Sequence, residues 1–316
     1  MSTWARAWHD ALYGEDGFYR RAEGPSGHFE TATHGPVGRA LATTLLGLAR
    51  DAGAHAVVDV GAGRGELLHA LREAGHEGPL VGVDVVERPA GLDPSSGWVR
   101  SPGGAALPSA RHVEESLGAP LDGALVVAHE WLDVVPCVVA QVDDEGRLRE
   151  VHVGPDGAET LGEDVGAHDL AWAQRWWPAR EPGQRVEVGR ARDDAWSGML
   201  DAWRPRAAVA VDYGHVRTQR PESGTLSGYR DGAVTAPTPD GSCDVTAHVA
   251  VDSLRHDELV MGADAVRRWG PSAASPEHDM ARRDPVGYLD ALARASAAGA
   301  LLGPPYGDFW WVVARG

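Results

Sequence analysis

The stretch Ala56-Val57-Val58-Asp59-Val60-Gly61-Ala62-Gly63-Arg64-Gly65-Glu66-Leu67-Leu68 decides the fold of this chain. Four of its first five residues are apolar and three are β-branched, which is typical of a buried parallel strand. Glycines at alternate positions follow, and Leu67, Leu68 and Leu71 then recur at helical spacing. The stretch therefore predicts a strand, a tight glycine turn and a helix whose unpaired N–H groups point at the turn.

The spacing of these glycines separates two classes of cofactor. In a dinucleotide fingerprint the third glycine stands about five residues after the first, whereas Gly61, Gly63 and Gly65 are packed one residue tighter and follow Asp59. This arrangement resembles motif I of the S-adenosylmethionine (SAM) methyltransferases. The next predicted strand ends in Asp84, where a carboxylate can hold ribose hydroxyls. We interpret the stretch as a SAM site. A glycine turn without a ligand is the alternative, and the spacing disfavours a nicotinamide oxidoreductase.

Composition excludes several kinds of protein. The formal net charge of −17 disfavours nucleic acid as a partner, because nucleic acid binding needs a basic footprint. No apolar run approaches the roughly 20 residues that cross a membrane, and no signal peptide is recognisable, so a cytoplasmic protein is expected. Cys137 and Cys243 are the only cysteines, and the 14 histidines are scattered, so no metal site is expected.

The remaining elements predict an α/β fold, a Rossmann-like class I SAM-dependent methyltransferase sheet with an inserted β-hairpin and long loop insertions. Residues 1–35 are interpreted as an N-terminal arm or lid, and 36–316 as the methyltransferase domain with insertions at about 137–185 and 215–260. Further strands are expected at 98–99, 121–128, 186–188, 207–211 and 309–314, with helices at 36–52, 165–180, 191–203 and 284–298.

Two of the insertions have distinct patterns. Residues 138–142 and 148–153 flank Asp143-Asp144-Glu145-Gly146-Arg147, which predicts an antiparallel hairpin outside the parallel sheet. Residues 217–244 are interpreted as a long loop. In the N-terminal arm, Trp4, Trp8 and Leu12 are expected on one face of a short helix.

With these segments in order, the chain resembles the MidA family, as a divergent bacterial-type member. Mitochondrial members of that family are complex I assembly factors described as protein arginine methyltransferases. The matching motifs run through nearly the whole chain: Gly17-Phe18-Tyr19, Gly27-His28-Phe29-Glu30-Thr31-Ala32, Asp59–Gly65, His129–Pro136, Val211–His215 and Gly241–Val249. The chain departs from the family pattern at Thr33-His34 and Trp131-Leu132, and the match is poor between 86 and 120. The resemblance implies SAM as cofactor and a protein arginine as methyl acceptor.

Candidate acceptor residues follow the later strands, where a doubly wound sheet binds its ligands. Glu130 and Asp133 stand three residues apart and share a face if a helical turn begins there, so they form a carboxylate clamp for a guanidinium. The alternative is that either residue caps a following helix. Tyr213 is interpreted as a wall of the same crevice and His215 as a polar contact or proton acceptor. A simple turn is the alternative for this pair.

The remaining candidates lie nearer the two loops. Asp244 and Thr246 are interpreted as an N-cap pair that starts a helix, with a reach into the site as the alternative. Phe29 and Thr31 are expected to close over SAM as part of the N-terminal lid.

Three hypotheses about function remain open. The first is SAM-dependent methylation of a protein substrate with an accessible arginine. The second is methylation of a small molecule on the same fold. The third is a SAM-binding assembly chaperone without turnover. A homodimer is left open as the assembly.

Overall fold

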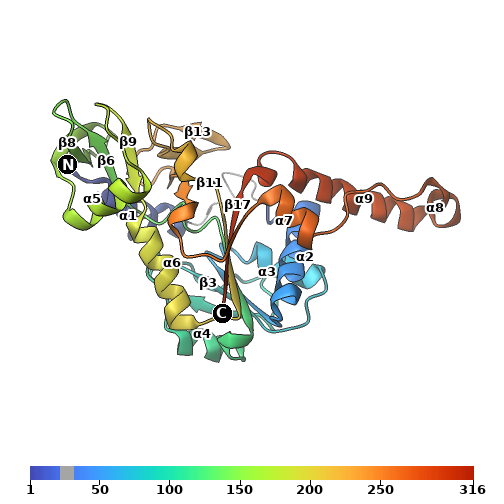
Figure 1. Ribbon diagram of the computed structural model, residues 1–316. Coiled ribbons are helices and arrows are strands. Elements are labelled where there is room, and N and C mark those ends of the chain that lie inside the picture. Colours follow the sequence, from blue (N-terminus) through green and yellow to red (C-terminus); the bar gives the residue numbers. More distant parts are fainter. Residues whose placement is uncertain (22–31) are drawn as a thin grey trace.

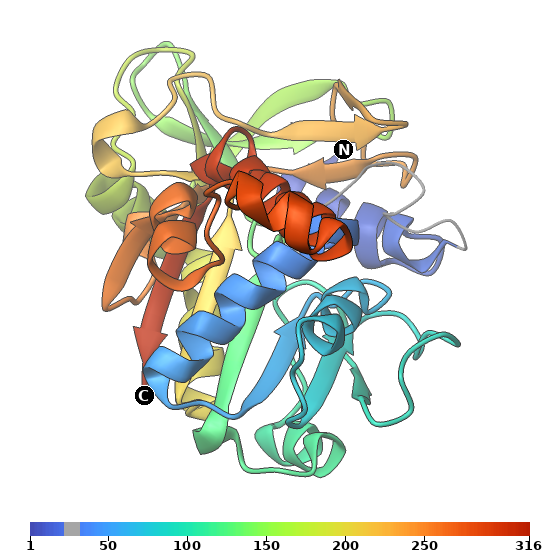
Figure 2. The same ribbon diagram turned by 90° about the vertical axis from the view of Figure 1, so that its right-hand side faces the viewer.

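The computed structural model describes residues 1–21 and 32–316 (Figures 1 and 2). Within this part of the chain, the central sheet has the strand order β16-β17-β10-β5-β2-β3-β4. Its strands are β2 (Ala56–Val60), β3 (Leu80–Asp84), β4 (Gly97–Arg100), β5 (Ala124–His129), β10 (Ala207–Asp212), β16 (Glu258–Met261) and β17 (Trp310–Arg315). The strands from β10 to β4 pair in parallel, and β17 pairs antiparallel with both β10 and β16. The predicted Rossmann-like α/β fold is confirmed.

Helices cover both faces of this sheet, and Figure 1 shows α2, α3 and α7 on the side opposite α6. The first layer contains α2 (Gly35–Ala52), α3 (Glu66–Glu73), α7 (Gly262–Trp269) and α9 (Pro285–Leu302), and the second contains α4 (Ala110–Leu117) and α6 (Arg190–Trp203). Neighbouring residues of one strand enter different layers. Val57 packs into the first apolar cluster and Val58 into the second, as the two-residue period of a strand requires. Both faces of β2 are therefore buried, which explains its continuous apolar sequence.

Local signals set the ends of the flanking helices. Ser109 caps α4, because its hydroxyl accepts a hydrogen bond from the His112 N–H at 3.4 Å. Gly53 ends α2 in the left-handed region, with a φ of 74°. Beyond α7, Figure 1 shows α8 (His278–Arg283) and the first half of α9 projecting from the rest of the molecule.

A second sheet is entirely antiparallel: β7 pairs with β1, β6 and β8, and β6 pairs in turn with β9. Its strands are β1 (Ser2–Thr3), β6 (Val138–Val142), β7 (Leu148–Val153), β8 (Glu159–Asp164) and β9 (Arg185–Val188), and α5 (Ala167–Trp176) packs beside β9. The pairing of β6 with β7 confirms the predicted hairpin outside the parallel sheet.

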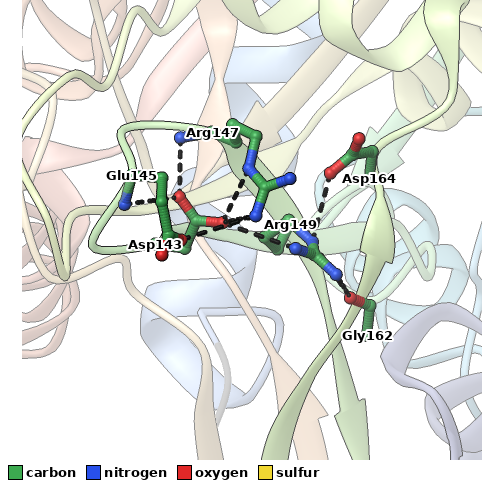
Figure 3. Close-up of polar contacts among 6 residues, drawn as sticks. All are labelled: Asp143, Glu145, Arg147, Arg149, Gly162 and Asp164. Atoms are coloured by element: carbon green, nitrogen blue, oxygen red, sulfur yellow. Dashed lines mark hydrogen bonds and ion pairs between the residues drawn. The ribbon is translucent and has the colours of Figure 1, made fainter.

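The turn of that hairpin is organised by one carboxylate (Figure 3). Asp143 accepts hydrogen bonds from the backbone N–H groups of Glu145 and Arg147 at 3.1 and 2.8 Å. The side chains of Arg147 and Arg149 complete its partners. Because every oxygen of this buried carboxylate has a donor, the cluster stabilises the turn and needs no ligand.

The segment interpreted as a long loop contains regular structure, which corrects the expectation for 217–244. Strands β12 (Ser227–Arg230), β13 (Ala233–Thr235) and β14 (Asp244–Thr246) form a small sheet, and β11 (Gly214–His215) pairs with β15 (Val249–Ala250). Asp231 and Gly232 form the two-residue turn between β12 and β13, with φ values of 51° and 75°. Positive φ at both central residues is typical of a type I′ hairpin turn.

The N-terminal helix α1 (Trp4–Tyr13) packs against this small sheet and the second sheet. Trp4, Trp8 and Leu12 are all buried, as predicted. The indole N–H of Trp8 donates to the Val245 carbonyl at 2.7 Å, which ties α1 to β14. Single 3₁₀ turns occur at Phe18–Arg20, Leu121–Gly123, Arg217–Gln219, Val251–Ser253 and Tyr306–Asp308.

The described ranges contain neither a membrane-crossing helix nor a cluster of metal ligands. In 1–21 and 32–316, no helix combines the length and apolar character that a membrane crossing requires. Within the same ranges, His, Cys, Asp and Glu side chains nowhere gather in threes in a way that could hold a metal ion.

Candidate functional site

A cavity of about 700 Å³ lies where β2, β3 and β5 end. Its walls come from the glycine turn after β2, from 84–87 after β3, from 129–134 after β5, and from the N-terminal residues Tyr13 and 19–21. The carboxyl ends of parallel strands are where doubly wound sheets bind ligands. The cavity has the size of a site for a nucleotide-like molecule together with a second group.

The glycine turn forms one wall in the conformation that its sequence predicts. Gly61, Gly63 and Gly65 all have positive φ, of 75°, 55° and 83°. A β-carbon on Gly65 would lie 2.8 Å from Leu92 Cδ1, and one on Gly63 would lie 3.3 Å from Glu66 Oε2. Because L side chains rarely adopt this backbone, each position requires glycine, and α3 begins directly after the turn.

Two acidic side chains accompany this turn. The carboxylate of Asp84, at the end of β3, accepts hydrogen bonds from the N–H groups of Gly63 at 2.8 Å and Val86 at 3.1 Å. Burial raises the pKa of Asp84 to about 6, although these N–H groups lower it in part. Asp59 is more deeply buried, and desolvation together with the charges of Asp84 and Glu66 raises its pKa to about 8.

A second wall, next to the glycine turn, is formed by the turn after β5, which we call the acidic turn (residues 130–135). Glu130 has a φ of 52°, in the left-handed region, and its N–H donates to the Val211 carbonyl at 2.9 Å. Residues 131–137 are described in full and contain no helix, and β6 follows at Val138. The hypothesis that Glu130 or Asp133 caps a helix is therefore wrong, and so is the helical turn expected to bring them onto one face.

Asp133 lies in the cavity wall and is only 5% exposed. Its Oδ2 accepts a hydrogen bond from the Thr246 hydroxyl at 2.8 Å. Its Oδ1 is buried and has no hydrogen-bond partner among the described residues. An unsatisfied carboxylate oxygen in a cavity wall is a place for a donor from a ligand.

Further carboxyl groups converge on Asp133. Asp212, at the end of β10, accepts hydrogen bonds from the N–H groups of Leu132 and Asp133 at 3.2 and 3.4 Å. Burial and then the neighbouring Asp133 carboxylate raise the pKa of Asp212 well above its usual range. Asp244 on β14 accepts a hydrogen bond from the Tyr19 hydroxyl at 2.9 Å, and burial raises its pKa to about 8. Glu130, Asp133 and Asp244 thus lie in one wall of the cavity, and the buried Asp212 is hydrogen-bonded to the turn that carries Asp133. We call these four residues the acidic cluster.

Sequence reasoning selected Glu130 and Asp133. It gave a reach of Asp244 into the site only as the alternative, which its place in the cavity wall supports, and it did not select Asp212. The N-cap interpretation of Asp244 and Thr246 is wrong, because both lie on a short strand and contact Tyr19 and Asp133. Asp212 was passed over in favour of its neighbours. Its signal was its position at the carboxyl end of a strand that pairs in parallel with β5.

Glu130 also contacts a histidine, but not as an ion pair. Burial, together with Asp133 and Asp244, raises the pKa of Glu130 to about 8. Desolvation lowers the pKa of His129 to about 4. Near neutral pH the His129 Nδ1 and Glu130 Oε1, 3.3 Å apart, therefore belong to an uncharged imidazole and a largely protonated carboxyl.

The other sequence candidates lie behind this wall or outside the described residues. Tyr213 packs on Phe309 with ring centroids 4.2 Å apart, and His215 contacts Trp177 and Arg220. Desolvation, and then the charge of Arg220, lowers the pKa of His215 to about 3. Neither Tyr213 nor His215 is among the described residues that line the cavity. Phe29 and Thr31 fall within 22–31, outside the described residues.

The fold and the cavity together define a Rossmann-like protein with a nucleotide-cofactor site next to an acidic pocket. The profile of a family described as "Putative S-adenosyl-L-methionine-dependent methyltransferase" matches residues 108–266, half of the chain. The chain belongs to this family of SAM-dependent methyltransferases, and its cofactor is SAM. The matched range includes the whole acidic cluster and begins after the glycine turn.

Solved structures give the same fold. One is a protein from Burkholderia thailandensis described as a "likely methyl transferase" bound to S-adenosylhomocysteine, with a TM-score of 0.70 and 21% identity. A native crystal structure of a protein of the same superfamily and organism gives a TM-score of 0.68 at 21% identity. Each comparison covers 99% of this chain and 87% of the other. No curated protein matches the chain.

Proposed function

We propose that the protein transfers a methyl group from SAM to a guanidinium nitrogen of an arginine side chain in a protein. One observation carries the proposal: the cavity that contains the glycine turn also contains buried Asp133, whose Oδ1 has no partner among the described residues. Glu130 and Asp244 stand beside it in the same wall. A cofactor site and an acidic acceptor site thus share one enclosure.

The cofactor end suits SAM in size and in charge. The backbone of Gly61 and Gly63 leaves room for the ligand, and Asp84 lies where ribose hydroxyls are held in such folds. Asp59 and Glu66 supply negative charge for the positive charges of the methionine part. SAM carries the methyl group on a sulfonium, which already activates this group for transfer. The residues of the protein therefore need only to position the two reactants and to exclude water.

The acidic end suits a guanidinium. This group is planar, permanently charged and presents a fork of N–H donors, for which carboxylates are the natural partners. The buried oxygen of Asp133 is satisfied by such a donor, or by a proton held on Asp212 while the site is empty. A neutral acceptor would bring no positive charge to favour the ionised forms of Glu130 and Asp244, whose pKa values burial raises to about 8.

The same carboxyl groups can accept the proton that the reaction releases. When the nitrogen–methyl bond forms, the sulfur–methyl bond breaks and its electron pair stays on sulfur. The guanidinium nitrogen that receives the methyl group gives up one proton. Glu130, with a pKa of about 8 in the empty site, is ionised beside a bound cation and then accepts that proton.

The test is to incubate the protein with methyl-labelled SAM and a lysate of its own cells, and to locate the label. Label in methylarginine after protein hydrolysis supports the proposal. Asp212→Asn and Glu130→Gln, which change the acidic end only, should reduce that label while S-adenosylhomocysteine binding persists. Label in the small-molecule fraction would instead favour a small acceptor. Cofactor binding without any labelled product would favour an assembly chaperone.

A further inference from the structure

Arg192 of α6 is a buried cation with an unusual set of partners. Its side chain is 1% exposed. Its Nε donates to the Val135 carbonyl at 3.1 Å, Nη2 to the Asp133 carbonyl at 2.8 Å, and Nη1 to the His248 carbonyl at 2.9 Å. The guanidinium also lies 5.6 Å from the centre of the Trp8 ring. Among the described residues it forms no ion pair with a carboxylate, although buried arginines are normally paired.

These contacts join the segments that carry the acidic cluster. The Asp133 carbonyl that Arg192 holds also accepts the Ala247 N–H at 3.1 Å. Thr246, next to Ala247, holds the Asp133 carboxylate. Arg192 therefore binds both the acidic turn and the segment 246–248, and these two segments contact each other at Asp133.

The acidic turn is held from its other side by Asp212. The N–H groups of Leu132 and Asp133 point to the Asp212 carboxyl on β10, and the carbonyls of Asp133 and Val135 point to Arg192 on α6. The peptide groups of the turn are thus oriented between a buried acid and a buried cation. Such an arrangement fixes the direction of the turn, because reversing any peptide would bring like partial charges together.

We propose that Arg192 is a positioning residue for the methyl acceptor. Its planar fork of donors holds three carbonyls from two segments and so keeps Asp133 in the cavity wall. A lysine carries the same charge but offers it as a single point, which cannot match three separated carbonyls in one plane. The role of Asp133 as an acceptor contact, on which this inference rests, belongs to the proposed function.

The test compares Arg192→Lys with Arg220→Lys. Arg220 is a control for the loss of a largely buried guanidinium, because its side chain is only 7% exposed and it also donates to backbone carbonyls, those of Trp176 and His215, away from the cavity. It differs from Arg192 in that it also pairs with the Asp252 carboxylate. The probe is methylguanidinium, titrated by NMR into protein saturated with S-adenosylhomocysteine. Arg192→Lys should weaken methylguanidinium binding by roughly tenfold, as expected when one charge-assisted contact is lost. Affinity for S-adenosylhomocysteine should stay within about twofold, since the glycine turn is untouched.

Arg220→Lys should lower the melting temperature and leave methylguanidinium affinity unchanged. Equal methylguanidinium affinity in Arg192→Lys and the parent protein would overturn the inference. If the parent protein binds S-adenosylhomocysteine but not methylguanidinium, the proposed function is at fault. A crystal structure of Arg192→Lys then decides the positioning role, and an undisplaced Asp133–Thr246 pair would overturn it.

A second variant covers the case in which Arg192→Lys does not fold. Thr246→Val removes only the hydroxyl that holds Asp133 Oδ2 and keeps the shape of the side chain. It should weaken methylguanidinium binding in the same direction. Unchanged binding in this variant would mean that the position of Asp133 does not matter for the acceptor, and the inference would fall with it.

Discussion

The backbone N–H of Gly63 donates to the carboxylate of Asp84, 21 residues further along the chain, at 2.8 Å. This bond joins the glycine turn after β2 to the end of β3, so the two halves of the cofactor site are one unit. A change in either residue is therefore expected to alter both.

Gly63→Val should abolish binding of SAM and of S-adenosylhomocysteine. The backbone at Gly63 has a φ of 55°, and a β-carbon would lie 3.3 Å from Glu66 Oε2, so valine strains the turn and fills the ligand space. Calorimetry measures the effect. The control is Gly198→Ala in α6, where a β-carbon meets no atom within 4 Å; it should bind normally and gain roughly 0.5–1 kcal/mol of stability. Binding of NAD in place of SAM by the parent protein would refute the assignment of SAM as the cofactor.

Binding of SAM should release protons near neutral pH. Burial raises the pKa of Asp59 to about 8, so this carboxyl is mostly protonated in the empty site at pH 7. A cationic ligand favours the ionised form, so affinity should rise as the pH increases toward 8 and level off above it. Titrations in buffers of different ionisation enthalpy measure the protons released.

Asp59→Asn should flatten that pH dependence between 7 and 9. The control is Asp193→Asn, because Asp193 is a half-buried carboxyl of raised pKa that contacts Trp172 and Ser253 outside the cavity. A pH slope that survives in Asp59→Asn would assign the protons to another group.

Glu130→Gln should reduce methyl transfer by at least about tenfold while SAM affinity hardly changes. Glutamine keeps the size of the side chain but removes a charge-assisted contact to a guanidinium, which contributes roughly 1.5–3 kcal/mol. Asp133→Asn is expected to behave in the same way, since no helix follows for it to cap. The measurement is initial rate and SAM affinity for both variants. Full activity of Glu130→Gln on the true substrate would rule out an arginine clamp at this site.

The same substitution should stabilise the protein at high pH. The pKa of Glu130 is raised in the folded state from 4.5 to about 8, chiefly by burial. Its contribution to the free energy of unfolding is therefore fully present below about pH 4.5 and is lost as the pH rises through about 8. Glutamine does not ionise, so Glu130→Gln should gain on the order of a few kcal/mol at pH 9 and nothing at pH 4.

Melting curves across this pH range measure that gain. Asp244→Asn should show the same trend, because burial also raises the pKa of Asp244 to about 8. A variant that is equally destabilised at pH 4 and pH 9 would indicate lost packing and not a relieved charge.

The parts of the fold that sequence predicts are those with a local cause. The strand, glycine turn and helix around Gly61 depend on residues that are neighbours in the chain, and the hairpin at 138–153 has its turn residues between two β-rich runs. The hairpin of β12 and β13 was missed although Asp231-Gly232 is a strong signal for it. Strand β8 offered no signal: Glu159–Asp164 is polar and mostly exposed, and only pairing with β7 makes it a strand.

The acidic cluster was harder to predict, because its residues converge from three elements. Glu130 and Asp133 were found from their place after β5. Asp212 joins them through the pairing of β10 with β5, and Asp244 through the bonds of Thr246 and Ala247, its neighbours in the chain, to Asp133. No spacing in the sequence records those contacts. Glu130 adopts the left-handed backbone conformation in place of the expected helical turn. The sequence gives no signal for this, because glutamate rarely adopts that conformation.

The alternation of Val57 and Val58 between the two helix layers has a consequence for how this chain can vary. Asp59 lies on the same strand and the glycine turn follows it directly, so one alternation of side chains sets both the packing of the core and the position of the cofactor site. Inserting or deleting a single residue between Ala56 and Gly61 would exchange the two buried faces of β2, so that each side chain would enter the other helix layer and Asp59 would move to the wrong face. The second sheet does not take part in this alternation. We therefore expect one-residue insertions and deletions to be tolerated around β8 and to prevent folding when they occur in β2.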